Sequence, residues 1–124
     1  MVRVFTTYFA KLRKLDNNLV PIAIVRYSPK WYDGKLYQIL APKADTLLDY
    51  KYYSDGDWKK FKRKYLEQLE RLDPEEVLND LETMSRGKDV VLVCFEKDDT
   101  HCHRSLCAKW LRDNLGICAR ELQI

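Results

Sequence analysis

The sequence predicts a small α/β protein, a three-layer sandwich in which helices flank a mostly parallel sheet. Two observations predict this class. Strand-like and helix-like segments alternate along the 124 residues, an order typical of parallel sheets. Residues 89–95 (DVVLVCF) form an unbroken apolar run, as expected for a strand buried on both faces. A chain of this length can form one core, so we expect a single domain over residues 1–124.

Two strands and two short helices are expected in the first half of the chain. Residues 2–8 (VRVFTTY) and 19–27 (LVPIAIVRY) are rich in β-branched and aromatic residues, which favours strands. Between them, residues 9–15 carry apolar side chains at helical spacing, which predicts a short helix. The second short helix is expected at residues 44–51.

Two longer helices are expected next. Residues 57–72 place apolar side chains at intervals of three and four, which predicts an amphipathic helix. The pair Asp73-Pro74 is typical of a helix start, and Gly87 is the expected C-cap of the helix that follows.

The buried strand, a polar loop and a last helix follow in that order. This helix is expected to open at residues 100–104 and to end at Gly116, and residues 117–124 are expected to form a final short strand. Both histidines and three of the four cysteines fall between Cys94 and Cys107. If the protein performs chemistry, we expect it in this part of the chain.

Composition and charge exclude several classes of protein. A hydrophobic content of 46% with 33% charged residues is that of a globular chain. No apolar run reaches the ~20 residues of a membrane span and the N-terminus lacks a secretory signal, so we expect a cytoplasmic protein whose cysteines are thiols. The net charge of +3 is uneven, because residues 1–64 hold 14 Lys/Arg and 6 Asp/Glu whereas residues 65–124 hold 8 and 13. This asymmetry permits a phosphate-bearing partner.

The start of the last helix predicts an anion-binding site. Backbone N–H groups at a helix N-terminus and the helix dipole both attract negative charge. Arg104 adds a planar set of donors for phosphate or carboxylate, and His101 or His103 adds a proton donor near neutral pH. The alternative for Arg104 is an ion pair with a nearby acid such as Glu96.

Polar residues beyond two strand ends extend this predicted site. Ligands of parallel sheets bind beyond the carboxyl ends of the strands. Arg26 and Ser28 lie just past one predicted strand, and Glu96 lies just past another. If these strands are neighbours, the three side chains share a crevice with the start of the last helix. Arg26 is then a second cationic arm, and Glu96 orients the ligand or acts as a base.

Cys102 is a candidate nucleophile, because a cysteine in the first turn of a helix beside a histidine favours the thiolate. The segment shares a strand, an anion-binding loop and an Arg-Ser step with rhodaneses and cysteine phosphatases. Those enzymes place their cysteine at the end of the strand and a glycine-rich loop before the arginine. Here Cys102 is two residues before Arg104, and the loop contains no glycine. Phosphatase-type catalysis is therefore not expected.

A metal site would use the cysteines and histidines of the same segment, a ligand set that suits zinc or iron. These residues are Cys94, His101, Cys102, His103 and Cys107. Their spacing is unfavourable, since the segment has no C-x-x-C pair and adjacent residues on a helix diverge. Cys94 and Cys107 are expected to pack in the core. We therefore expect no metal and no cofactor.

Four motifs follow one another along the chain: TTYFAKL (6–12), IVRYSP (24–29), LAP (40–42) and VVLVCFEKDDTHCHRSLCAKWL (90–111). In these motifs the chain resembles domain-of-unknown-function family 488, uncharacterised α/β proteins with a Cys-His-Arg signature. The resemblance covers nearly the whole chain and implies a compact α/β domain, but it implies no reaction. The site residues that it implies are Arg26, Glu96, Cys102, His103 and Arg104.

The sequence thus predicts a cytoplasmic domain that binds a small anionic or nucleotide-like ligand at the Cys102-His103-Arg104 helix start. The residues expected to hold the ligand are Arg104, Arg26, Ser28 and His101. The candidate catalytic residues are Cys102, His103 and Glu96, and whether the protein is an enzyme stays open. One alternative is a non-catalytic nucleic-acid or protein binding module, and the other is a thiol- or metal-dependent enzyme. No membrane partner is expected, and the sequence does not predict the oligomeric state.

Overall fold

The computed structural model describes residues 2–44, 46, 55–97 and 101–124. Within them, five strands form one sheet in the order β3-β2-β4-β1-β5, and every neighbouring pair is parallel. The strands are β1 (Val4–Tyr8), β2 (Leu19–Ala23), β3 (Lys35–Leu36), β4 (Asp89–Cys94) and β5 (Ala119–Glu121). The predicted α/β class with a parallel sheet is confirmed.

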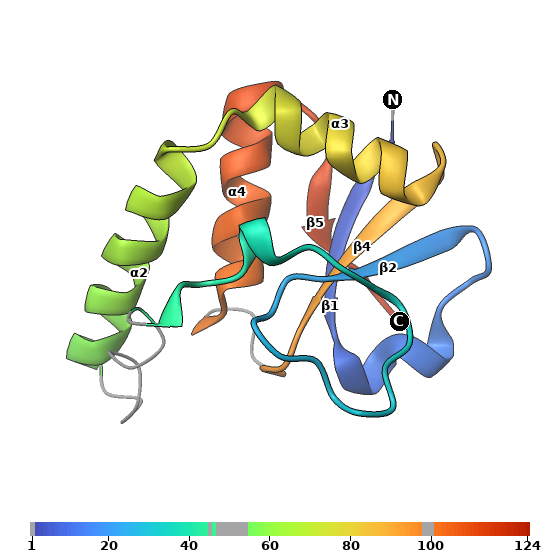
Figure 1. Ribbon diagram of the computed structural model, residues 1–124, viewed down its shortest axis with the longest axis horizontal. Coiled ribbons are helices and arrows are strands. Elements are labelled where there is room, and N and C mark those ends of the chain that lie inside the picture. The colour runs from blue at the N-terminus through green and yellow to red at the C-terminus, as the bar shows by residue number, and fades with distance from the viewer. Residues whose placement is uncertain (1, 45, 47–54, 98–100) are drawn as a thin grey trace.

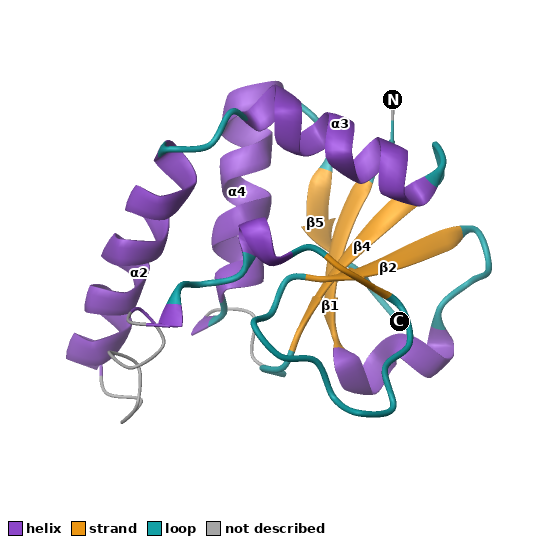
Figure 2. Ribbon diagram, viewed as in Figure 1, coloured by secondary structure: helices purple, strands orange, loops and turns teal. Residues whose placement is uncertain are grey.

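The helices are divided between the two faces of the sheet (Figures 1 and 2). One face is covered by α2 (Asp55–Glu70), α3 (Pro74–Ser85) and α4 (His103–Leu115), which enclose the larger apolar core. The other face is covered by the 3-10 helix η1 (Phe9–Lys14) and by Tyr32, which pack over a smaller core. A second 3-10 helix, η2 (Gln38–Leu40), precedes the helical half.

Strand β4 is the centre of the sheet, because it pairs with β1 on one side and with β2 on the other. Its side chains alternate between the two cores: Val90 and Leu92 pack under the α-helices, and Val91 and Val93 pack under η1. All four are fully buried, as predicted from the unbroken apolar run. The carboxyl ends of β1, β2 and β4 therefore meet at one edge of the sheet, and the predicted site residues follow two of these ends.

Helix boundaries follow the predicted capping signals closely. Asp73 is the N-cap of α3, and its carboxylate accepts a hydrogen bond of 3.0 Å from the N–H of Glu75. At the other end of α3 the C-cap is Arg86, in the left-handed conformation with φ 55°, rather than Gly87 as predicted. Helix α4 ends at Gly116, as predicted, with φ 64°.

The predicted strand over residues 19–27 is too long, because β2 ends at Ala23. The backbone continues along β4 for one more hydrogen bond, from the N–H of Ile24 to the carbonyl of Val93 at 3.0 Å, and then leaves the sheet. The two-residue strand β3 was not predicted, since its exposed Lys-Leu sequence carries no strand signal. The helix predicted at residues 44–51 lies largely outside the described residues.

The described residues contain no candidate for a membrane-spanning helix. None of the helices there combines the length and the apolar character needed to cross a bilayer.

Candidate functional site

The site lies where β4 ends and α4 begins. Cys94 is the last residue of β4, and Glu96 follows it in the loop. Cys102 is the N-cap of α4, with extended backbone angles, and its side chain makes no capping hydrogen bond. His103 is the first helical residue. The strand and the helix therefore hold four side chains with possible chemistry at one edge of the sheet.

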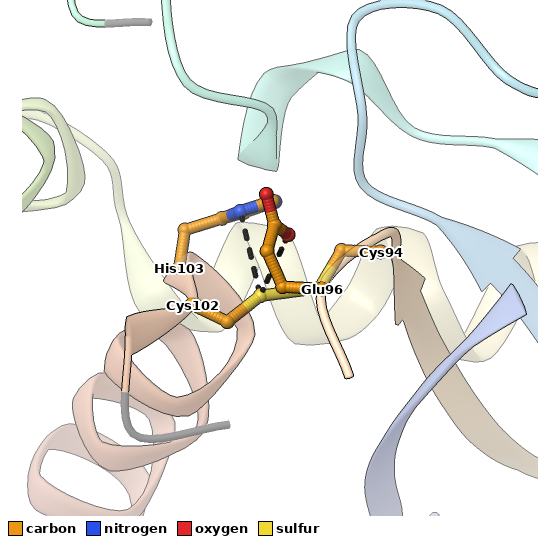
Figure 3. Close-up of side chains that lie close together, drawn as sticks. All are labelled: Cys94, Glu96, Cys102 and His103. Carbon is orange, nitrogen blue, oxygen red and sulfur yellow. Dashed lines mark hydrogen bonds between the residues drawn. A yellow bond between two sulfur atoms is a disulfide. The ribbon is translucent and has the colours of Figure 1, made fainter. Parts of the chain in front are cut away.

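These four residues, Cys94, Glu96, Cys102 and His103, form what we call the thiol cluster (Figure 3). One ligand atom from each lies within 4.8 Å of all the others. The sulfur of Cys102 is 3.3 Å from Oε2 of Glu96 and 3.9 Å from Nδ1 of His103. Cys94 and Cys102 are buried, His103 is 5% exposed, and Glu96 is half-buried. The cluster is thus mostly removed from water, with its carboxylate at the outer side.

His103 is held in one orientation by the backbone beyond β2. Its Nε2 lies 2.6 Å from the carbonyl oxygen of Ile24, and since a carbonyl only accepts, Nε2 carries the hydrogen. Burial lowers the pKa of His103 from 6.5 to about 4, against the raising effect of the Ile24 bond, and the nearby Arg104 lowers it further. The ring is therefore neutral at pH 7, and Nδ1 faces Cys102 with a lone pair. The sequence predicted that His103 donates or shuttles a proton, and in this geometry Nδ1 is the atom that can accept one.

The sulfurs of Cys94 and Cys102 are adjacent and can pair as a disulfide, whereas the sequence predicted four free thiols; Cys107 and Cys118 are free. The Cα atoms of the pair are 7.8 Å apart. Disulfides usually span about 4.4–6.8 Å between Cα atoms, so a stable cross-link here requires backbone movement. A disulfide sulfur carries no proton, so the hydrogen bond from Cys102 to Glu96 belongs to the reduced pair.

Arg104 is fully buried, and all five of its N–H donors are engaged within the chain. Nε and Nη2 bind the two carboxylate oxygens of Glu121, both at 2.9 Å. Nη2 also donates to the carbonyl of Lys97 at 3.2 Å, and Nη1 donates to the carbonyl of Glu96 and to the sulfur of Cys94, the latter at 3.2 Å. Because these partners occupy all of its donors, Arg104 stabilises the fold in this structure and offers no N–H group to a ligand.

A cavity of about 290 Å³ opens beside the thiol cluster, and we call it the site pocket. Five of the seven predicted site residues line it, from three separate parts of the chain. The lining consists of Val25, Arg26, Tyr27, Pro42, Phe61, Phe95, Glu96, His101, Cys102 and His103. The two predicted residues outside this lining are Ser28 and Arg104.

Arg26 is the cationic group of the site pocket. It is half-buried, and its Nε and Nη2 atoms both donate to the carbonyl of Pro42 at 3.3 Å. Among the described residues these bonds use two of its five N–H donors, which leaves three for a ligand. The ring of His101 packs edge-on against Trp58, with 5.0 Å between the ring centroids. A larger cavity of about 690 Å³ lies elsewhere, between α2, α3 and α4, and contains no cysteine or histidine.

Two residues outside the seven predicted site residues shape this site. Cys94 was weighed as a metal ligand and expected to pack in the core; it is buried in the smaller core, as expected, and also belongs to the thiol cluster. Its place as the last residue of a buried strand, directly before the polar loop, was a usable signal. Glu121 was not considered at all, although it holds Arg104 through two hydrogen bonds. No local pattern connects these two residues, which belong to α4 and β5.

Fold and site together define an α/β protein whose central parallel strand leads into a Cys-His-Arg helix start. The chain belongs to domain-of-unknown-function family 488, since a family model matches residues 10–115. That model is DUF488-N3a, described as the active DUF488-N3 subclade. Searches of curated proteins and of solved structures found no match. The resemblance stated from the sequence motifs is therefore confirmed, and the family supplies no function of its own.

Proposed function

We propose that this protein binds a small ligand with an anionic group in the site pocket. One observation carries the proposal: a single cavity is lined by Arg26, Glu96, His101, Cys102 and His103, residues that three segments of the chain contribute. Pockets that combine an apolar wall with a few convergent polar groups are the usual form of small-molecule sites. The guanidinium of Arg26 is the group that would bind the anion.

The pocket's size and walls narrow the class of ligand. Its volume of about 290 Å³ is at the lower end of the range for ligand pockets, about 300–1,000 Å³, which favours a compact molecule over a whole nucleotide. Phe61, Phe95 and Tyr27 supply aromatic surface, and the last two are 52% and 81% exposed at the rim. A planar or apolar body with one carboxylate or phosphate group fits these walls best.

A thermal-shift screen of small anions tests this proposal. The probes are inorganic phosphate, benzoate, phenyl phosphate, AMP and ATP. A ligand at about 100 times its Kd should stabilise the protein by roughly 2.7 kcal/mol. Since a hydrogen bond to a charged group contributes about 1.5–3 kcal/mol, Arg26→Gln should weaken binding about 10- to 100-fold. Phenyl phosphate or benzoate should give a larger shift than ATP.

Arg63→Gln is the matched control, because it removes the same charge from an exposed position of α2. It should leave the ligand-induced shift unchanged. Equal shifts in the wild type and in Arg26→Gln would refute the assignment of Arg26, and the absence of a shift with every probe would refute the proposal as a whole.

A thiol-dependent enzyme is a second candidate, and the contact between Arg104 and Cys94 favours it. A guanidinium N–H 3.2 Å from a sulfur stabilises the thiolate, and Cys94 is at the strand end where rhodaneses and cysteine phosphatases place their cysteine. Cys102 would be its neighbouring thiol, with Glu96 as the proton acceptor. The matching family model is described as the active subclade, which supports an enzymatic role without naming a site or a reaction.

The pH profile of alkylation by iodoacetamide tests this second candidate. In reduced protein with EDTA, peptide mass spectrometry follows Cys94 and Cys102 separately. At least one of them should react with a midpoint below about 7.5, because a thiolate that an arginine stabilises forms at lower pH. The guanidine-unfolded protein is the control, with both midpoints near about 8.5. Midpoints near this unfolded value in the folded protein would speak against a reactive thiol.

A further inference from the structure

We infer that the thiol cluster is a zinc site, in which the sulfurs of Cys94 and Cys102, Nδ1 of His103 and a carboxylate oxygen of Glu96 bind one ion. Two thiolates, one imidazole and one carboxylate are all common zinc ligands, and four of them complete a tetrahedral site. Soft thiolates with an imidazole favour zinc over magnesium or calcium, which prefer oxygen ligands.

The spacing of the four ligand atoms is close to that of a tetrahedral ion site. Zinc–ligand bonds of about 2.0–2.3 Å place neighbouring ligand atoms about 3.3–3.8 Å apart. The four atoms of the thiol cluster lie within 4.8 Å of one another. Side-chain rotations that move these atoms by about 1 Å would therefore bring them to the spacing of a tetrahedral zinc site. The Cα separation of 7.8 Å between Cys94 and Cys102 is too wide for an unstrained disulfide, and it allows the two sulfurs to move apart to the spacing of zinc ligands.

The orientation of His103 is that of a metal-binding histidine. Such histidines usually donate their second ring N–H to a carboxylate or a backbone carbonyl, which fixes the tautomer and aims the other nitrogen at the metal. Nε2 of His103 donates to the carbonyl of Ile24 at 2.6 Å, and Nδ1 points at Cys102. This bond therefore prepares the ring for coordination through Nδ1.

The surroundings of Cys94 provide the second observation. Nη1 of Arg104 donates to its sulfur at 3.2 Å, as donors around zinc thiolates do, and the guanidinium is itself fixed by Glu121. The positive charge of Arg104 is balanced by Glu121, so its contribution to the site is the N–H donor that it places on the sulfur of Cys94. A positively charged N–H donor stabilises the thiolate form of a cysteine more than the neutral thiol, and the thiolate is the form that binds zinc.

The position of Glu96 gives the site an open side. Cys94 and Cys102 are buried, whereas Glu96 is half-buried and lines the site pocket. The carboxylate is therefore the ligand that a water molecule or a bound molecule can replace. The sequence predicted no metal, because the segment has no C-x-x-C pair and adjacent residues on a helix diverge; Cys94 and Cys102 are eight positions apart. The fold, and no short motif, brings them together.

Cobalt titration of untagged protein reduced with a phosphine and freed of metal tests the inference. The wild type should take up one equivalent of Co²⁺, with the near-ultraviolet charge-transfer band of cobalt–thiolate bonds and the intense visible bands of tetrahedral cobalt. One equivalent of Zn²⁺ should abolish these bands and protect two thiols from alkylation. Protein purified without chelator should contain zinc by elemental mass spectrometry.

Variants locate the ion. Cys102→Ser and His103→Gln should each weaken cobalt binding about 100-fold or more, since loss of an outer-sphere partner alone costs about 10- to 100-fold. Cys118→Ser, which removes an exposed free thiol, should leave the spectrum and the affinity unchanged. If the variants fail to fold, as judged by circular dichroism, the wild-type cobalt spectrum still decides whether thiolates bind the ion.

Two outcomes would overturn the inference: reduced wild type that takes up no cobalt, or uptake that is equal in Cys102→Ser and the wild type. The titration contains no anionic ligand, so its result is separate from the experiment on Arg26.

Discussion

Replacing Arg104 with methionine is expected to lower the free energy of unfolding by about 3 kcal/mol or more. Removing one partner of a buried ion pair usually costs about 3–5 kcal/mol, because the other charge stays behind without compensation. Glu121 would be that residual charge, and its side chain is 23% exposed, so water relieves part of the cost. This exposure is why we expect the lower end of the range.

The loss extends beyond the ion pair. The carbonyls of Glu96 and Lys97 both accept hydrogen bonds from Arg104, and methionine leaves them without this donor. These carbonyls belong to the loop that follows β4, so the variant should also loosen the start of the site. Arg104→Lys keeps the charge but cannot make five bonds in one plane, and should be intermediate.

Urea unfolding followed by circular dichroism measures the effect. Lys109→Met is the control, because Lys109 forms an ion pair with Asp113 on the surface of α4, with the side chains 65% and 58% exposed. It should change the free energy of unfolding by less than about 0.5 kcal/mol. If Arg104→Met does not fold, Arg104→Lys supplies the measurement. A loss below 1 kcal/mol in Arg104→Met would contradict the structural role of this residue.

The metal-free protein is expected to lose about 3 kcal/mol of stability between pH 7 and pH 4 because of His103. Its pKa is about 4 in the folded protein and 6.5 when unfolded. As the pH falls below 6.5 the unfolded state binds a proton that the folded state does not, so stability declines by about 1.4 kcal/mol per pH unit. The decline stops below pH 4, where both states are protonated. Tyr65, Arg104, Cys102 and Glu96 are the polar or charged groups that face the ring.

Urea unfolding from pH 4 to 7.5 in EDTA measures this dependence. Other acidic groups also titrate in this range, so the result is the difference between the wild type and His103→Gln. Glutamine can still donate to the carbonyl of Ile24 but does not titrate, so the slope should become shallower in this variant. Arg63→Gln, a change at an exposed position of α2, is the control and should keep the wild-type slope. Identical slopes in the wild type and in His103→Gln would contradict the lowered pKa.

The sequence predicted correctly those helices and strands whose position depends on residues within the segment itself. The apolar run of β4, the cap at Asp73 and the stop at Gly116 each predicted an element that the structure confirms. The errors fall where tertiary contacts decide. Residues 24–27 look like strand, but only Ile24 still pairs with β4, and β3 is set by its neighbour β2 alone.

The sequence predicted where the candidate site lies in the fold, but it did not predict which side chains contact one another there. The sequence predicted that Glu96, Cys102 and His103 lie close together, because Glu96 follows the end of a strand and the other two begin the next helix. It offered an ion pair as the alternative role of Arg104 but did not predict the partner, which is Glu121 on β5. Nor did it distinguish Cys94 from a core cysteine, because burial alone is common to both.

The hydrogen bond between His103 and Ile24 joins the two sites that we propose. Ile24 lies two residues before Arg26. The carbonyl of Ile24 accepts the hydrogen bond from His103, and the side chain of Arg26 is the cation that would bind the anion. A ligand that moves the backbone at Arg26 would also move the carbonyl of Ile24, which orients the ring of His103. If metal binding changes the affinity for the anion by some factor, anion binding must change the affinity for the metal by the same factor. The backbone at residues 24–26 would make the pocket and the thiol cluster a coupled pair.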